Sequence, residues 1–528
     1  MAVCDPIPVI DLFAGPGGLG EGFSAARFRG QHIFRIALSI EKDPHAHATL
    51  MLRGFFRQFT GRRVPEAYYE HLRGELARDD LYARYPAEAQ RAAQEAWHAE
   101  LGGASAPPDL VRRRIRQSLA GAKAWVLIGG PPCQAYSIAG RSRNRGIRGY
   151  ALERDGRHRL YEEYLRIVAD LWPPVFVMEN VKGLLSTTIR GELLFERMCD
   201  DLSDPARTRP RQKRRRYRIL SLGEKVERSP FDGDSVQSFV VRAERHGIPQ
   251  ARHRVILLGI REDLGDITPP VLRSQEAVPA DAVLQGLPRL RSGLSRASGR
   301  MSKYAGGQDV WLNAIKREIN SRWVDGNHGI DNRETVRELI RSTIKELCVP
   351  PADRGAEFVR GQVTVNYEPE WFLDDRIGGA CNHASRAHMD RDLHRYLFAA
   401  CYAAVNHRSP RMKDFPPDLQ PNHRNVAAAI NGGYFDDRFR VQLRNEPATT
   451  ITSHIHKDGH YYIHPDPSQC RSLTVREAAR IQTFPDNYYF TGLRSQQYIQ
   501  VGNAVPPLLA RQIAEVVYGV LRGAGMTG

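Results

Sequence analysis

The sequence predicts an α/β protein with a doubly wound sheet and a second, less regular domain. Short apolar runs that end at glycine or at a polar residue recur through the first 260 residues, as is typical of buried parallel strands. Between about residues 265 and 445 such runs are few, and Pro, Gly, Arg and His are interspersed. A chain of 528 residues is also too long for a single core, so two or more domains are expected.

The first predicted strand, Ile7 to Leu12, runs into the turn Phe13-Ala14-Gly15-Pro16-Gly17-Gly18. Glycines in such a turn let the backbone approach a ligand closely, and the next helix directs its N-terminus at it. A second strand, Ile33 to Ile40, ends at Glu41. An acid at the end of the second strand of a nucleotide-binding sheet typically holds ribose hydroxyls. Turn and acid together indicate a cofactor site.

Residues 55–105 are rich in Ala, Glu and Arg and predict a helical insertion, with a helix from Tyr85 to Leu101. The run Ala124 to Ile128 then predicts a buried strand that ends in Gly129-Gly130-Pro131-Pro132-Cys133-Gln134. Proline has a fixed φ and no N–H, so this loop is stiff and holds a thiol at the carboxyl end of a strand. Taken alone, Cys133 is either a nucleophile or a small buried apolar residue.

Two further strands are expected at Pro173 to Met178, ending in Glu179-Asn180-Val181, and at Val255 to Ile260, after Gln250-Ala251-Arg252-His253-Arg254. Strong patterning returns near the C-terminus. Thr474 and Glu477 predict a capping box, and Gly502-Asn503-Ala504-Val505-Pro506-Pro507 leads into a final helix from Leu508 to Leu521.

These elements predict three segments: 1–265 with the insertion at about 55–105, 266–445, and 446–528, which returns to the first domain. The net charge of +16 favours a polyanionic partner such as nucleic acid, although a basic enzyme of another kind is an alternative. Seven cysteines without a CxxC pair fit a reducing cytoplasm, and no secretory signal or membrane-spanning run is seen.

Four histidines lie close together near the C-terminus, with Cys470 nearby: His454, His456, His460 and His464. Zinc is an alternative here, but the spacing is not that of a common structural site, so no metal is predicted. Alternation with Tyr461, Tyr462 and Ile463 instead predicts a hairpin around Asp458-Gly459.

Five motifs in this order resemble those of the DNA cytosine-5 methyltransferases, over residues 7–260 and about 445–520. They are Asp11-Leu12-Phe13-Ala14-Gly15-Pro16-Gly17-Gly18, Pro131-Pro132-Cys133-Gln134, Glu179-Asn180-Val181, Gln250-Ala251-Arg252-His253-Arg254 and Gly502-Asn503-Ala504-Val505-Pro506-Pro507. The resemblance implies a Rossmann-like, S-adenosylmethionine-dependent methyltransferase fold with a mixed sheet. It implies a variable target-recognition domain at 266–445, as in the bacterial restriction-modification members.

For the chemistry, the resemblance implies that Cys133 adds to C6 of a flipped-out cytosine, so that C5 can accept a methyl group. Glu179 would stabilise the charge at N3, Arg254 would contact the ring, and Arg252 would support the site. Considered alone, Glu179 would be interpreted first as an ordinary exposed loop acid, and the alternative for the two arginines is a surface ion pair.

For the cofactor, S-adenosyl-L-methionine, the resemblance implies contacts from Phe13, Ala14, Gly15 and Gly17 at the methionine end and from Glu41 at the ribose. Further cofactor-binding positions are Pro132, Asn503 and Val505. The family usually has an aromatic residue after the ribose acid, where this chain has Lys42. The family's further acid near the adenine is assigned to Asp109, for which a helix N-cap is the alternative.

The expected partner is double-stranded DNA, read by residues within 290–445, with the enzyme acting as a monomer beside an independent restriction endonuclease. Two alternatives keep the fold: a tRNA cytosine-5 methyltransferase, and a catalytically inactive DNA-binding regulator. The large variable domain disfavours the first, and the presence of Cys133 and Glu179 disfavours the second. A nicotinamide-dependent dehydrogenase would explain the glycine-rich turn but neither the Cys133 loop nor the Gly502 motif.

Overall fold

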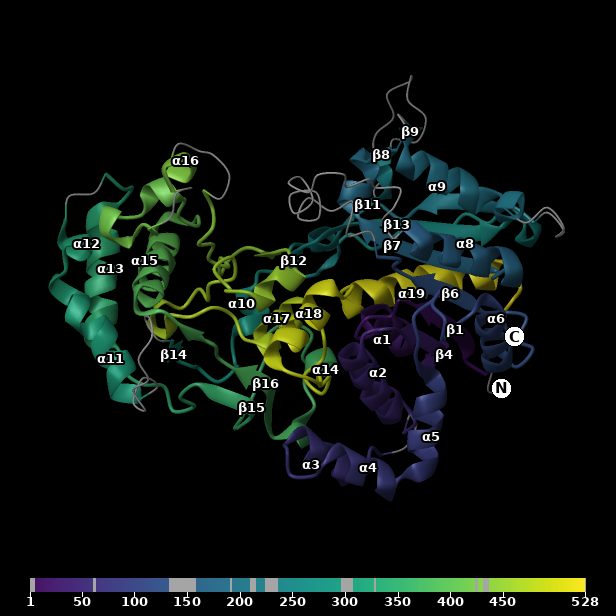
Figure 1. The fold of residues 1–528 in the computed structure, drawn as a ribbon, viewed down its shortest axis with the longest axis horizontal. Helices are drawn as coiled ribbons and strands as arrows, with labels where there is room; N and C mark the ends of the chain where they lie inside the picture. The colour runs from purple at the N-terminus through teal and green to yellow at the C-terminus, as the bar shows by residue number, and fades with distance from the viewer. Residues whose placement is uncertain are drawn as a thin grey trace. The chain divides into compact units, whose positions relative to one another are not determined.

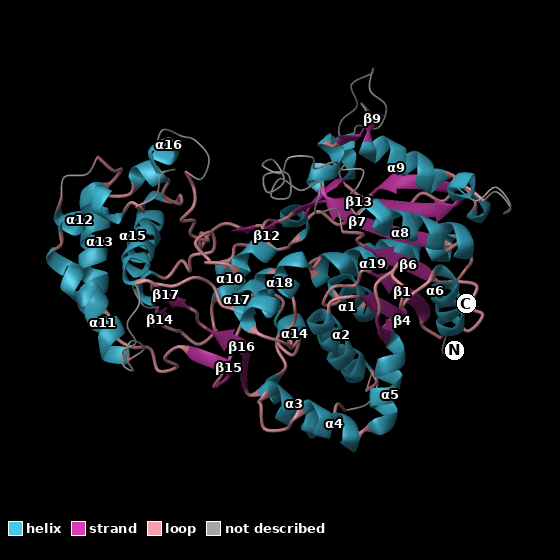
Figure 2. Ribbon diagram, viewed as in Figure 1, coloured by secondary structure: helices cyan, strands magenta, loops and turns pink. Residues whose placement is uncertain are grey.

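The protein forms two compact units, which are described separately below. The computed structural model describes residues 5–59, 63–132, 158–189, 192–208, 215–223, 236–295, 307–326, 329–422, 426–430 and 436–527. Unit 1 comprises residues 1–64, 82–276 and 504–528, and unit 2 comprises residues 65–81 and 277–503. Figure 1 labels the elements along the chain, and Figure 2 distinguishes helices from strands.

Unit 1 is built on a mixed eight-stranded sheet. Its strand order is β10-β13-β7-β6-β1-β4-β5, with β11 beside β13, and Figure 1 shows the central strands following one another in this order. Strands β5, β4, β1, β6 and β7 are parallel, whereas β10, β11 and β13 run antiparallel to their neighbours. The chain passes from β1 to β4 on one side and later to β6 on the other. The carboxyl ends of β1 and β6 therefore flank the switch point at which open sheets bind ligands.

The bounds of these strands are β1 Ile7–Leu12, β4 Phe34–Glu41, β5 Ala96–His98, β6 Val126–Gly129, β7 Val175–Val181, β10 Tyr217–Ser221, β11 Val240–Arg242 and β13 His253–Arg261. All five predicted strands are therefore confirmed, as β1, β4, β6, β7 and β13. Every residue of β1 is buried, because helices cover both faces of a parallel sheet. Double-sided burial explains why these strands appear as continuous apolar runs.

The 55–105 insertion is not wholly helical. Its helix α5 ends at Glu95, and the next three residues form β5, which pairs in parallel with β4. The Ala99 N–H extends this pairing by donating to the Glu41 carbonyl oxygen at 3.0 Å. The predicted helix to Leu101 was therefore wrong beyond Glu95. Pairing with the open edge of β4 satisfies backbone groups that local helix propensity does not address.

Helices of unit 1 carry a buried network of charges. Arg53 and Arg57 on α2 both pair with Glu21 on α1, with Arg53 Nε 2.9 Å from Glu21 Oε2, and Arg57 also pairs with Glu95 on α5. Burial acts to raise the pKa of Glu21, but the two arginines hold it below its usual value. The helix that follows the glycine-rich turn is thus tied to the insertion. The helix bounds are α1 Gly18–Ala25, α2 Pro44–Arg57, α5 Pro86–Glu95, α6 Pro108–Leu119, α8 His158–Leu171, α9 Leu194–Ser203 and α19 Pro507–Gly523.

Unit 2 combines two short strand pairs with helices around α15. Strand β15 (Gly355–Arg360) is antiparallel to β16 (Gly379–Ala384), and β14 (Gly293–Leu294) is parallel to β17 (Ala387–His388). The helices lying wholly in unit 2 are α3 Glu66–Leu72, α10 Asp281–Leu284, α11 Gln308–Lys316, α12 Arg322–Asp325, α13 Arg333–Glu346, α14 Pro369–Phe372, α15 Asp390–Asn406, α16 Val426–Ile430, α17 Val475–Ile481 and α18 Arg494–Asn503. The remaining elements are α4 Arg78–Arg84, β2 Arg27–Phe28, β3 Gln31–His32, β8 Thr188–Ile189, β9 Glu192–Leu193, β12 Gln250–Ala251 and β18 Ala448–Thr449.

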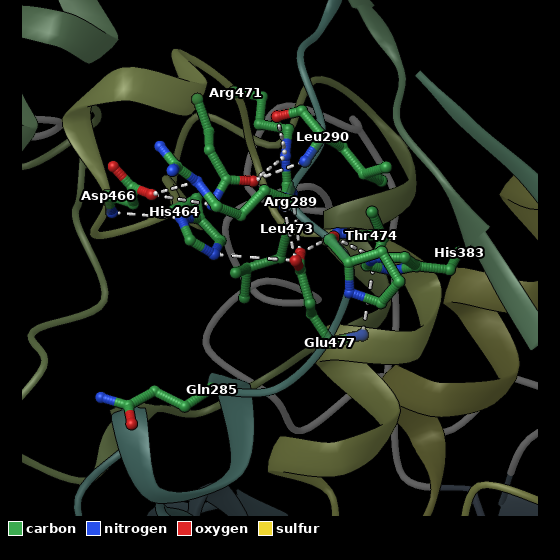
Figure 3. Close-up of polar contacts among 12 residues, drawn as sticks. Gln285, Arg289, Leu290, His383, His464, Asp466, Arg471, Leu473, Thr474 and Glu477 are labelled. Atoms are coloured by element: carbon green, nitrogen blue, oxygen red, sulfur yellow. Dashed lines mark hydrogen bonds and ion pairs between the residues drawn. The ribbon is translucent and has the colours of Figure 1, made fainter. Parts of the chain in front are cut away.

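A buried polar network fixes the start of α17 in unit 2 (Figure 3). Thr474 and Glu477 form the predicted capping box, and Glu477 also pairs with both terminal nitrogens of Arg471 at 2.6 and 2.7 Å. His383 Nδ1 lies 2.9 Å from Thr474 Oγ1. The capping box is confirmed, and a buried arginine reinforces it.

The histidine-rich segment does not form the predicted hairpin. Residues Ser453–His456 form a 3₁₀ turn, and Ile463 makes isolated bridges to Val441 and Ser472. The hairpin prediction was wrong because Ile463 pairs with these two segments and not with a strand across Asp458-Gly459. Among the described residues, no three His, Cys, Asp or Glu side chains gather as they would around a metal.

The compact units divide the chain differently from the expected segments. Residues 446–503 group with unit 2, and only residues 504–528 of the C-terminal segment group with the sheet of unit 1. Burial explains this division, since α17 is wholly buried within unit 2. One stretch of the described chain, Arg494–Gly523, is long and apolar enough to cross a membrane, but 72 % of its apolar 18-residue window is buried, as in the core helix of a globular protein.

Candidate active site

The glycine-rich turn joins β1 to α1 through three residues with positive φ. The φ angles are 55° at Phe13, 57° at Gly15 and 97° at Gly17. The Ala14 N–H donates to the Ile40 carbonyl oxygen at 3.1 Å, which anchors the turn on β4. A non-glycine residue such as Phe13 in the left-handed region is uncommon and often marks a functional site. The turn therefore lies at the carboxyl ends of β1 and β4.

Glu41 lies beside this turn, at the end of β4. Its carboxylate accepts hydrogen bonds from the backbone N–H groups of Gly15, Lys42 and Asp43 at 2.8, 2.9 and 2.8 Å. Burial raises the pKa of Glu41, and these N–H donors act in the opposite direction. The side chain remains partly exposed, so its outer face can accept a further hydrogen bond. Glu41 thus holds the turn in place through its hydrogen bonds and keeps part of its carboxylate accessible to a ligand.

The C-terminal motif reaches the same turn through Val505. A Cβ on Gly18 would lie 2.2 Å from the Val505 carbonyl oxygen, and one on Gly22 would lie 2.4 Å from Ala510 Cβ. Glycine at both positions therefore lets α1 pack directly against the segment that leads into α19. Asn503, the other residue expected from this motif, is exposed at the end of α18 in unit 2.

A buried acid that the sequence analysis did not single out lies beneath the turn. Asp11 in β1 is 1 % exposed, and neither carboxylate oxygen has a hydrogen-bond partner among the described residues. Burial raises its pKa to about 8, opposed by the charge of Arg57. The signal available in the sequence was an acid inside an otherwise apolar strand, next to the glycine-rich turn.

The Pro131-Pro132 loop begins against Glu179. Strands β6 and β7 are parallel with Gly129 paired to Met178, so Gly130 lies next to Glu179. A Cβ on Gly130 would be only 2.8 Å from Glu179 Oε2. Pro132 is partly exposed at the start of the loop, and Cys133 lies outside the described residues. The chain segment that leads to the thiol is thus in direct contact with the expected acid.

Arg254 in β13 pairs with Glu179 in the neighbouring strand β7. Val181 of β7 is opposite Arg254 of β13, and Glu179 is opposite Ile256, so Glu179 and Arg254 point to the same face. Arg254 Nε is 2.8 Å from Glu179 Oε1, and both side chains are 14 % exposed; the contact is an ion pair without hydrogen-bond geometry. Burial lowers the pKa of Arg254, and the charge of Glu179 opposes this shift.

Arg252 and Asn180 are buried behind this pair. Arg252 is 1 % exposed, and its backbone N–H donates to the Gln250 carbonyl oxygen at 2.9 Å. The Asn180 side-chain oxygen accepts a hydrogen bond from the Val181 N–H at 2.8 Å. Both residues hold the backbone that presents Glu179 and Arg254.

Asp109 lies in the first turn of α6, where its side chain faces solvent. The residue at the N-cap is Pro107, so the N-cap alternative for Asp109 was wrong. The Asp109 side chain is 73 % exposed and pairs with Arg112 at 2.6 Å. The acid that follows β5 is instead Glu100, which pairs with Lys42 Nζ at 3.3 Å. The sequence analysis missed Glu100 because it assigned this segment to a helix.

Comparison with known proteins adds a family to this geometry. The family model for C-5 cytosine-specific DNA methylases matches residues 84–204 and 231–519. The type II methyltransferase M.Bpa9945I of Bacillus paralicheniformis is 32 % identical over 98 % of this chain and 99 % of its own length. The DNA (cytosine-5-)-methyltransferase M.ApeKI of Aeropyrum pernix is 29 % identical over 76 % of this chain and 83 % of its own.

A solved structure has the same fold. It is of a protein described as a DNA modification methyltransferase encoded within an E. coli prophage, and it aligns with a TM-score of 0.50 and 18 % identity. The alignment covers 98 % of this chain and 99 % of that one. The likeness confirms the predicted α/β, Rossmann-like methyltransferase fold.

Proposed function

We propose how this chain performs the reaction of the family to which it belongs, the C-5 cytosine-specific DNA methylases. The chain is a DNA cytosine-5 methyltransferase. The observation that carries the proposed mechanism is the contact of Gly130, at the root of the Cys133 loop, with the Glu179–Arg254 ion pair. This contact supports the proposal because it brings the start of the loop that leads to Cys133 against the acid and the guanidinium group.

In the proposed reaction, the Cys133 thiolate forms a bond to C6 of cytosine. The Glu179 carboxyl group donates a hydrogen bond at N3, where negative charge would otherwise accumulate, and Arg254 donates to O2. C5 then becomes nucleophilic enough to accept a methyl group. Loss of the C5 proton and cleavage of the S–C6 bond release the methylated base and regenerate the thiolate.

The residues around the turn fit S-adenosyl-L-methionine. Burial raises the pKa of Asp11 to about 8, so a cationic ligand nearby would favour its ionised form, and the positive φ angles of the turn let a ligand approach the backbone closely. We assign its binding to Phe13, Ala14, Gly15, Gly17, Glu41 and Val505, with Pro132 and Asn503 as further contacts. Glu100 is a second candidate, beside Asp109, for the acid near the adenine. When bound, the group supplies an electrophilic methyl sulfonium.

The proposed substrate is a specific site in double-stranded DNA, from which the target cytosine is extruded. The net charge of +16 supports a polyanionic substrate, and residues 266–445 are the proposed target-recognition domain. The names of the relatives, type II methyltransferases, support a role in restriction-modification. We further propose that a cognate endonuclease acts independently of this chain. We propose that the enzyme acts as a monomer in the cytoplasm, since one flipped base needs one active site.

Substitution of Cys133 tests this mechanism. Cys133→Ala removes the nucleophile and is expected to abolish transfer of radiolabelled methyl groups from S-adenosylmethionine to plasmid DNA. The control is Cys348→Ala, which removes an exposed cysteine of unit 2 and should retain activity. DNA that contains 5-fluorocytosine should trap a covalent adduct with the wild type only, whereas an inactive regulator would form none. Undiminished transfer by Cys133→Ala, or methylation of tRNA in place of DNA, would contradict the proposal.

A further inference from the structure

Unit 2 holds an arginine in an unusual turn. Arg354 lies immediately before β15, between Asp353 with a φ of 51° and Gly355 with a φ of 68°. Its carbonyl oxygen accepts a hydrogen bond from the Ser385 N–H at 2.8 Å. The left-handed φ of the non-glycine residue Asp353 requires support from the surrounding fold, and Gly355 adopts its positive φ without strain. The backbone therefore holds Arg354 in a defined position.

The guanidinium group of Arg354 packs directly over Gly293. A Cβ on Gly293 would lie 2.6 Å from Arg354 Cζ, so a larger residue there would displace the guanidinium. Gly293 is itself fixed in β14, where its N–H donates to the Arg386 carbonyl oxygen at 3.1 Å. The position of the Arg354 side chain thus depends on the absence of a side chain at residue 293.

The neighbours of Arg354 add positive charge. Arg291 is 1 % exposed and forms an ion pair with Asp353, so the acid that precedes Arg354 in the sequence is already paired with another arginine. Arg494, the first residue of α18, donates from Nη1 to the Ser385 carbonyl oxygen at 2.7 Å. Burial and the charges of Arg291 and Arg494 lower the pKa of Arg354.

The Arg354 guanidinium has no directly bonded acid within the described part of the chain, although the charge of Asp353 opposes the lowering of its pKa. It makes no ion pair and no side-chain hydrogen bond there, and its Nε is buried without an acceptor. Partial burial and the neighbouring cations disfavour the charge of this guanidinium, and a bound anion would offset both effects. The planar fork of donors matches the oxygens of a phosphate.

A buried network makes this site rigid before any ligand binds. Gln469 Oε1 accepts a hydrogen bond from the Leu290 N–H at 3.0 Å. Arg471 Nε donates to the Leu290 carbonyl oxygen at 3.2 Å, and Figure 3 shows both of these residues. Arg471 is in turn held by Glu477. The segment that carries Arg291 and Gly293 is thus anchored at Leu290, the residue before Arg291.

Two large apolar side chains are exposed close to Arg494 and Gly293. One precedes Arg494 in the sequence, and the other follows the strand that pairs with Gly293. Leu493, 72 % exposed, precedes Arg494, and Met389, 49 % exposed, follows β17, the partner of β14. Exposed apolar side chains beside clustered cations are typical of a surface that contacts a macromolecule. A DNA strand offers both phosphates and apolar faces to such a surface.

We propose that Arg354, with Arg494 beside it, forms a phosphate-binding site in unit 2 that takes a backbone phosphate of the DNA substrate. This assignment rests on the proposed function and names a contact that positions the duplex without reading its sequence. The ligand class is a phosphodiester, bound by charge-assisted hydrogen bonds from the guanidinium groups.

The test compares three full-length variants by fluorescence anisotropy with a mixed-sequence duplex, over a series of salt concentrations. Arg354→Gln should weaken binding by about three- to tenfold at 100 mM salt and reduce the slope of log K against log salt by about 0.9. The charge-matched control is Arg317→Gln, because Arg317 is 59 % exposed and already paired with Glu318 and Asp390. Its binding and slope should stay close to those of the wild type.

Gly293→Ala provides an independent test that keeps every charge. The added Cβ should displace the Arg354 guanidinium, so the salt slope should fall as it does in Arg354→Gln, with a thermal unfolding curve to verify folding. For Arg354→Gln the turnover number at saturating DNA should match the wild type, since no reacting group is removed.

The outcomes of these experiments distinguish a failure of the proposed function from a failure of the phosphate site. If wild-type protein transfers no methyl group to DNA, the proposed function fails. If it does, but the slope for Arg354→Gln equals that of Arg317→Gln, the phosphate site is wrong. Binding of inorganic phosphate that depends on Arg354 without any change in DNA affinity would assign the site to a free anion and would also overturn the proposal.

Discussion

At the scale of single residues, the ion pair between Glu179 and Arg254 links the two side chains that the mechanism places on the cytosine ring. Both side chains are mostly buried, so each charge is stabilised by the other more than by water. Gly130 approaches the carboxylate because it has no side chain. Glu179 lies in β7, Arg254 lies in β13 and Gly130 directly follows β6, so the geometry follows from the register of these three strands.

Glu179→Gln is expected to lower the turnover number by about 10²- to 10⁴-fold, because an amide cannot supply the acid at N3. Loss of the ion pair should also lower the free energy of unfolding by about 1–3 kcal/mol. The matched control is Glu244→Gln, which removes the pair between Glu244 and His253 on the same strand as Arg254. Steady-state kinetics on duplex DNA and urea denaturation measure both effects. Equal turnover in the two variants would argue against an acid at residue 179.

At the scale of elements, α1 and α19 pack through glycine. Gly18 and Gly22 lie one turn apart on α1, and each meets the C-terminal segment without room for a Cβ. Only Gly18 touches Val505, next to the turn that we assign to the cofactor. The charges of Glu21, Arg53, Arg57 and Glu95 hold α1 from the other direction, through α2 and α5.

Gly18→Ala should raise the KM for S-adenosylmethionine by about tenfold or more, because the new Cβ forces the turn away from Val505. Gly22→Ala introduces a similar clash one turn further along and serves as the control. Both variants should lose about 1–3 kcal/mol of stability through overpacking. Thermal unfolding and cofactor titration separate the two effects. A KM that rises equally in both variants would mean that packing alone, and not the turn, sets affinity.

At the scale of the whole molecule, unit 2 buries histidines in their neutral form. Burial lowers the pKa of His383 and of His464 to about 4, although Glu477 opposes the shift in both. The unfolded chain binds protons at these histidines near pH 6.5, whereas the folded chain does so only near pH 4. Stability is therefore fully present above pH 6.5 and is lost as the pH falls towards 4.

As the pH falls from 7 to 5, each buried histidine is expected to lower the free energy of unfolding by about 2 kcal/mol. His464→Gln should flatten this dependence in urea denaturation at the two pH values. His407→Asn is the control, since His407 is exposed and its φ of 54° suits asparagine. An unchanged pH dependence in His464→Gln would show that His464 is protonated as easily in the folded protein as in the unfolded chain.

The sequence by itself determined the sheet strands, the glycine-rich turn, the capping box at Thr474 and the family. Doubly buried strands and glycine turns are dictated by local chemistry, so their residues are visible in order along the chain. Local patterns could not reveal β5, because its pairing partner β4 lies more than fifty residues away. The same applies to Ile463, whose bridges to Val441 and Ser472 replaced the predicted hairpin.

Only the tertiary structure decided which polar residues lack partners. Asp11 and Arg354 are unremarkable as letters, and their significance comes from what surrounds them: a buried carboxylate without a donor, and a guanidinium between two other cations. Glu100 likewise gained its place beside Lys42 only when β5 joined the sheet. Burial and the compensation of charge depend on segments distant in sequence, and so they are fixed when the chain folds and not before.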